Sequence, residues 1–230
     1  MRSNYWYGRL SRHWQRFLNN PYSHLLWSLI LLFVSFAVLD SNSQWQQISL
    51  MSIFFVTVLF VIETFKLPKK FITPFRAIAA LGYLFNLLGI MRDIEQRSLF
   101  YLLGESIQLI FMGISVVLII KRIFADNNVT GDTLRGGISA YLMLGIVWYQ
   151  IYNIILSLNP QAFKEQLSSY QLFYFSFVTL TTVGYGDILP AHRTTMMMSN
   201  LEAIIGQLYP AIIIAKLVSI YVVQKLEDPK

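Results

Sequence analysis

The sequence predicts an all-α membrane protein with six transmembrane helices, and with a short re-entrant helix and a loop between the fifth and the sixth. Hydrophobic residues make up 55% of the 230 residues and charged residues only 13%, which is far from the average soluble protein. The hydrophobic residues occur in long blocks, as membrane-spanning helices require. Lys and Arg gather in alternate connections between the blocks, a pattern typical of membrane proteins.

Six apolar blocks mark the expected spans, at about residues 25–39, 48–64, 77–91, 99–120, 137–156 and 195–223. The third has 15 apolar or small residues, fewer than the roughly 17 to 25 that cross a bilayer. We therefore expect a basic, aromatic N-terminal segment, a four-helix transmembrane bundle, a polar linker, a two-span unit with the loop, and a short tail. Their expected bounds are 1–23, 24–122, 123–135, 136–224 and 225–230.

The basic residues predict how the chain is oriented. With the N-terminus inside and six crossings, thirteen of the 18 Lys and Arg residues fall inside and four outside, while Lys216 lies within the last span. This asymmetry predicts a multi-pass protein of the cell membrane with both termini in the cytoplasm. The net charge of +6 then reflects orientation, so we expect no nucleic-acid partner. The N-terminal segment either lies on the inner membrane surface or is a disordered basic lead.

A polar run, Thr181-Thr182-Val183-Gly184-Tyr185-Gly186-Asp187, stands between the last two spans. Glycines at alternate positions can adopt positive φ at little cost, so that successive carbonyls turn toward the same side. Four copies around an axis would stack rings of carbonyl oxygens, with the Thr182 hydroxyl as the lowest ring. Such rings can replace the water shell of a potassium ion. The other interpretation is a chance Gly-X-Gly turn, but a phosphate-binding loop needs a preceding strand and usually a lysine.

From Thr182 to Gly186 the sequence is identical to the Thr-Val-Gly-Tyr-Gly signature of potassium channels. The chain resembles small prokaryotic six-span potassium channels over residues 136–224. The resemblance implies that residues 171–180 form a pore helix, that the loop is a selectivity filter, and that the protein is a homotetramer in the lipid bilayer. It also implies K⁺ as the permeant ion, no cofactor and no enzymatic activity. The implied ion-binding residues are Thr182, Val183, Gly184, Tyr185 and Gly186.

The residues that would support the filter are Thr181, Asp187, Tyr174, Phe175 and Val178. Two of these positions depart from the family pattern. Many relatives carry a tryptophan pair where Tyr174 and Phe175 stand, so the packing around Tyr185 is expected to be looser or to use Tyr174. Some relatives carry a glutamate where Val178 stands, so Asp187 lacks that partner.

The last span contains the residues that would bend and close the pore. Gly206 lies where the inner helix of many relatives bends, and Gly and Pro both favour bending, so Gly206 and Pro210 are a predicted hinge. Gly206 can also pack closely against the fifth span. Ile214 and Val218 belong to an apolar stripe and are a candidate gate; the alternative is an ordinary buried stripe. Lys216 lies off this stripe, and we expect it to extend toward the membrane surface.

The function implied is passive, potassium-selective conduction that is not steeply voltage-gated, because residues 98–120 contain no Lys or Arg and only Glu105 as an ionisable side chain. One alternative is a non-conducting or modulatory subunit that needs a partner chain. A secondary transporter would be expected to show inverted repeats, which are not evident. A membrane enzyme would need a catalytic pair, and the three histidines are scattered.

Overall fold

The computed structural model describes residues 21–38, 44–64, 69–91, 99–125 and 130–227. Most of the N-terminal segment and the last three residues lie outside this part, so the predictions for them stay predictions. The helices of the described part are α2 (Pro21–Val38), α3 (Gln44–Thr64), α4 (Lys69–Met91), α5 (Leu99–Ala125), α6 (Gly131–Leu158), α7 (Ser169–Leu180) and α8 (Arg193–Glu227).

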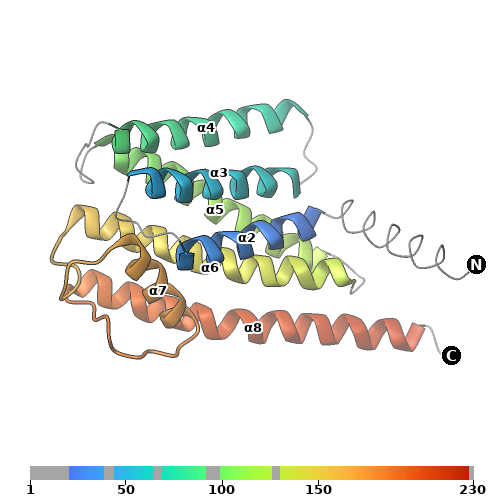
Figure 1. Cartoon of the computed structure of the whole chain (residues 1–230). Coiled ribbons are helices and arrows are strands. Elements are labelled where there is room, and N and C mark those ends of the chain that lie inside the picture. Colours follow the sequence, from blue (N-terminus) through green and yellow to red (C-terminus); the bar gives the residue numbers. More distant parts are fainter. Residues whose placement is uncertain (1–20, 39–43, 65–68, 92–98, 126–129, 228–230) are drawn as a thin grey trace, which may run out of the picture.

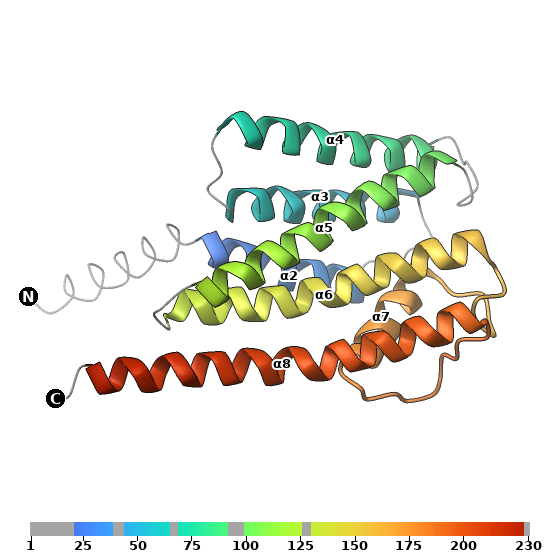
Figure 2. The ribbon, with the colours of Figure 1, turned by 180° about the vertical axis from the view of Figure 1, so that it is seen from behind.

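Six long helices run side by side and alternate in direction, while the short helix α7 lies between α6 and α8 (Figures 1 and 2). The described residues contain no strand, only an isolated bridge between Phe163 and Pro190. The start of α2 and the end of α8 lie at one end of the bundle, and the loop after α7 lies at the other. The predicted all-α membrane fold, with a short helix before the last long one, is confirmed.

The helices differ in length from the predicted spans, chiefly at the ends that the charge pattern is expected to place in the cytoplasm. Residues 123–125 and 131–135 of the expected polar linker are helical, because α5 continues past Ile120 and α6 begins at Gly131. Thr130 caps α6: its hydroxyl accepts from the Thr133 amide, and the Thr133 hydroxyl accepts from the Thr130 amide. The helix α4 begins well before the predicted third span and includes Pro74 near its start.

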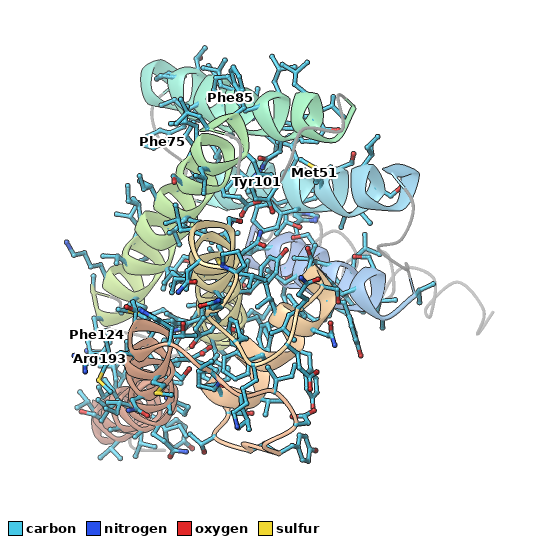
Figure 3. The ribbon with its side chains drawn as sticks, turned by 90° about the vertical axis from the view of Figure 1, so that its left-hand side faces the viewer. Met51, Phe75, Phe85, Tyr101, Phe124 and Arg193 are labelled. Atoms are coloured by element: carbon cyan, nitrogen blue, oxygen red, sulfur yellow. The ribbon has the colours of Figure 1, made fainter. Side chains whose placement is uncertain are left out.

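Within the described residues, three helices are long and apolar enough to cross a membrane, namely α5, α6 and residues Arg193–Val223 of α8. Shorter apolar stretches occupy Tyr22–Val38, Met51–Phe60 and Ile72–Leu88, within α2, α3 and α4. Seen from the end, α3 and α4 lie farther from α8 than α2, α5 and α6 do (Figure 3). The helices α3 and α4 are therefore connected to α6, α7 and α8 mainly through α2 and α5.

An aromatic cluster joins α2 to the back of α7. The ring of Phe36 stacks on that of Phe173, with centroids 4.2 Å apart and an angle of 8° between the planes. Phe33 meets Phe177 edge to face at 4.6 Å, and Tyr149 of α6 meets Phe173 at 5.7 Å. Aromatic pairs of this kind add stability beyond the area that they bury. The N-terminal bundle thus holds the short helix in place from behind.

Substitution Phe36→Ala should weaken this support. Removing a buried ring leaves a cavity, which we expect to cost about 3 kcal/mol of the free energy of unfolding. Thermal unfolding of the detergent-solubilised protein measures the effect. The control is Leu31→Ala on the same helix, because Leu31 is 56% exposed and should change the midpoint little. Equal midpoints for the two variants would contradict the role given to Phe36.

Candidate functional site

The signature run begins where α7 ends. Ser168 and Gln171 cap the start of α7 reciprocally, and Leu180 is its last residue. Beyond it the chain turns back on the helix: the amides of Val183 and Gly184 donate to the carbonyl of Val178, at 3.0 and 3.4 Å. These bonds satisfy a carbonyl that a helix end would otherwise leave without a partner. Val178, predicted to support the filter, contacts the run through its backbone carbonyl.

The backbone of the run alternates in the sign of φ. Thr182, Gly184 and Gly186 have φ of 58°, 57° and 78°, and Val183 and Tyr185 are not among the residues with positive φ. The two glycines thus adopt the expected conformation, which turns successive carbonyls toward one side. The positive φ of Thr182 was not predictable from the sequence, because a β-branched residue rarely adopts positive φ. Its conformation is held by neighbours, and its amide donates to the Thr179 carbonyl at 2.9 Å.

The side chain of Gln207 on α8 contacts the side chain of Thr182. Its Nε2 lies 2.6 Å from the Thr182 Oγ1 and donates to it. The sequence alone indicated no partner for Gln207. The contact joins the lowest oxygen of the run to the long helix α8.

Tyr174 lies beside the run at its other end. Its hydroxyl donates to Asp187 Oδ2 at 2.7 Å, and its ring lies parallel to that of Tyr185, with centroids 6.5 Å apart. Asp187 lacks the partner that a glutamate at position 178 would give, as expected, but Tyr174 takes that place. Phe175, also predicted to support the filter, is buried and meets Tyr152 and Phe163 edge to face.

Gly206 marks the closest approach of α8 to α7. A Cβ added at this position would lie 1.8 Å from the Leu180 carbonyl oxygen, which no side chain could accept. The expected close packing is therefore present, but the partner is the end of α7 and not the fifth span. Pro210 lies four residues later and has no amide hydrogen, so the Gly206 carbonyl loses its usual helical partner. Both features of the predicted hinge thus meet where α8 passes the run.

The candidate gate residues Ile214 and Val218 are 59% and 55% exposed. They share a face of α8 with Gln207. At 3.6 residues per turn, Lys216 lies about 180° from the centre of this face. Its Nζ lies 5.9 Å from the ring of Phe124, at the end of α5 (Figure 3). Lys216 is therefore off the stripe, as predicted, and packs toward α5.

A buried glutamate joins three helices. Glu202 of α8 is 0% exposed. The Tyr152 hydroxyl of α6 lies 2.5 Å from its Oε2, and the Ser176 hydroxyl of α7 lies 2.8 Å from its Oε1. A carboxyl group in a predominantly apolar span was the sequence signal that could have marked this residue. Its partners were not predictable, because they come from helices that are distant in the sequence. The arrangement fixes α7 between α6 and α8.

The chemical groups of the site are suited to a bare monovalent cation. The described residues contain no group of three His, Cys, Asp or Glu side chains that could hold a metal ion. The oxygens along Thr182–Gly186 are backbone carbonyls and the hydroxyls of Thr182 and Tyr185. Backbone carbonyls are the ligands that replace water around potassium in channel filters.

Residues 137–223 match the protein family described as "Ion channel". Over 87 residues, the chain is 31% identical to the "Two pore potassium channel a" of Oryza sativa subsp. japonica. These two matches support an ion-channel pore domain at residues 137–223. The match covers 38% of this chain and 23% of the rice protein, so the chain corresponds to only part of that relative. No solved structure matches the chain significantly.

Substitution Gln207→Leu should disturb the position of the Thr182 hydroxyl. It removes one hydrogen bond to Thr182, worth about 1 kcal/mol, which corresponds to roughly a fivefold effect on an equilibrium at that oxygen. We expect potassium flux through liposomes containing the purified chain to fall by about this factor. The control Gln166→Leu changes an exposed glutamine of the loop before α7 and should leave the flux unchanged. A flux that is the same in both variants would show that the Gln207 contact has no part in conduction.

Proposed function

We propose that this chain is the subunit of a homotetrameric channel that conducts K⁺ selectively and passively. The observation that carries the proposal is the uninterrupted run Thr182–Gly186, placed at the end of α7 with alternating signs of φ. Four such runs around an axis would stack rings of oxygens at the spacing that a dehydrated potassium ion needs. The ion is the transported substrate. The match to the "Ion channel" family and the likeness to a potassium channel support the same function.

The exposed surfaces of a single chain support a tetramer. Val183 is 53% exposed and Tyr185 71% exposed, so the run faces outward from its own chain. Irregular backbone at membrane depth is tolerated only when protein buries it or water surrounds it. The face of α8 beside the run is also largely apolar and exposed, with Ile204, Leu208 and Ile212 each about half exposed. Copies of the same chain would cover both surfaces and centre the run on an axis.

The arrangement of the helices supports the proposed orientation. The start of α4, the end of α5, the start of α6 and the end of α8 lie at one end of the bundle (Figure 1). Arg122 and Arg135 belong to this end, whereas the loop with the signature lies at the other. By the preference of basic residues for the inner side, this end faces the cytoplasm and the filter faces outward.

Selectivity tests the proposal directly. Reversal potentials of the purified chain in planar bilayers should follow the potassium gradient. Gly184→Ala or Gly186→Ala should abolish selective current, because an alanine is strained at φ of 57° or 78°. The control is Gly113→Ala, since a Cβ at Gly113 would meet no atom within 4 Å.

Two results would speak against this function. Equal permeability to sodium and potassium in the unaltered protein would rule out a selective filter. A purified chain that assembles but carries no current would favour the alternative, a subunit that conducts only with a partner chain.

We expect the open probability to depend only shallowly on membrane potential. Steep gating moves roughly three to four charges per subunit, each worth about 2.3 kcal/mol per 100 mV. Between Leu99 and Ile120, α5 carries no Lys or Arg, and Glu105 is buried. Recordings over a range of voltages measure this dependence, with Glu105→Gln as the companion variant. A steep conductance–voltage curve that persists in Glu105→Gln would contradict the prediction.

A further inference from the structure

The hydrogen-bond contacts around the buried carboxyl group of Glu202 need more donor hydrogens than an ionised glutamate and its partners supply. The hydroxyl of Ser176 lies 2.8 Å from Glu202 Oε1 and 2.7 Å from the backbone carbonyl oxygen of Gly145. Both of those oxygens are acceptors if Glu202 is ionised. A serine hydroxyl carries one hydrogen, so it can donate to only one of them. One of the two short contacts would then join two oxygens with no hydrogen between them.

A proton on Glu202 satisfies every contact. If Oε1 carries the proton, it donates to the Ser176 oxygen, and the Ser176 hydroxyl donates to the Gly145 carbonyl. The hydroxyl of Tyr152 donates to Oε2, at 2.5 Å. The result is a continuous chain of hydrogen bonds from α6 through α8 and α7 back to α6. A fully satisfied buried network of this kind fixes the positions of its members.

The surroundings of Glu202 offer nothing to balance a negative charge. Within the described part of the chain, Glu202 makes no ion pair, and its hydrogen-bond partners are the neutral groups of Tyr152 and Ser176. The other ionisable group that faces it is the phenol of Tyr141, also on α6. An isolated charge at 0% exposure inside a span is costly, whereas a neutral acid with a donor and an acceptor in place is not.

We propose that Glu202 is a positioning residue of the filter. It acts as a neutral acid whose carboxyl O–H donates a hydrogen bond to the Ser176 hydroxyl oxygen. The proposal rests on the proposed channel function in one respect: the purpose of holding α7 is to position the filter. Ser176 lies two residues before Val178, whose carbonyl accepts from the amides of Val183 and Gly184. Holding Ser176 therefore holds the end of α7 on which the run turns back.

Infrared spectroscopy locates the proton without relying on conduction. The probe is the difference spectrum at neutral pH between the unaltered chain and Glu202→Gln, both in lipid. We expect Glu202→Gln to lose the C=O band of a protonated carboxyl group, while the carboxylate bands stay unchanged. The matched control is Glu165→Gln, because Glu165 is exposed in the loop before α7 and should lose a carboxylate band instead. Loss of a carboxylate band in Glu202→Gln would overturn the proposal.

Rescue by a conservative variant tests the positioning role. Glutamine offers one acceptor and an N–H donor, so Glu202→Gln should keep potassium flux within about twofold of the unaltered chain. Glu202→Leu leaves the buried Tyr152 and Ser176 hydroxyls without this partner and should lower the flux by roughly tenfold. Ser176→Ala provides a second test if the leucine variant does not fold, and it should lower the flux similarly while retaining the protonated-carboxyl band.

A flux in Glu202→Gln as low as in Glu202→Leu would overturn the positioning role, as would an unchanged flux in Ser176→Ala. An unaltered chain that carries no current would contradict the proposed function only. The infrared result would then still decide whether Glu202 is the donor.

Discussion

The contact between α8 and the last carbonyl of α7 is the constraint on which the rest of the pore domain depends. Only a glycine at position 206 lets the Leu180 carbonyl oxygen approach so closely. That approach sets the distance between α7 and α8, and it brings Gln207, the next residue, within 2.6 Å of the Thr182 hydroxyl. The geometry of the run Thr182–Gly186 therefore depends on a missing side chain in a helix that follows it in the sequence.

Support for the run comes from two sides by different interactions. From behind, the aromatic rings of α2 pack on Phe173 and Phe177 of α7, a contact in which shape decides the fit. From α8 and α6, polar contacts through Glu202 set the position of α7 along and around its axis. Packing alone allows a helix to slide or rotate, whereas directional hydrogen bonds do not. The combination fixes a short helix that has only one end free for the filter.

The sequence was sufficient to predict the elements but not the contacts between them. Apolar blocks and basic connections predict the helices and their order, and the positive φ at Gly184 and Gly186 follows from the residue type. The positive φ of Thr182 does not, because neighbours hold it against its own preference. Likewise, the partners of Glu202 come from helices 26 and 50 residues away in the sequence, and hydropathy carries no information on such pairings.

Membrane insertion explains why so few polar residues decide the arrangement. Lipid is as apolar as a leucine side chain, so burying apolar surface against another helix gives little preference for one partner over another. Small residues and buried polar groups supply the preference instead. In this chain Gly145 and Gly206 admit Phe177 and the Leu180 carbonyl at distances that larger residues would forbid. Glu202, which would be costly if unpaired, has both carboxyl oxygens satisfied only when α6, α7 and α8 meet in this arrangement. The free-energy cost of misplacing α7 or α8 thus arises mainly at residues close to the run Thr182–Gly186.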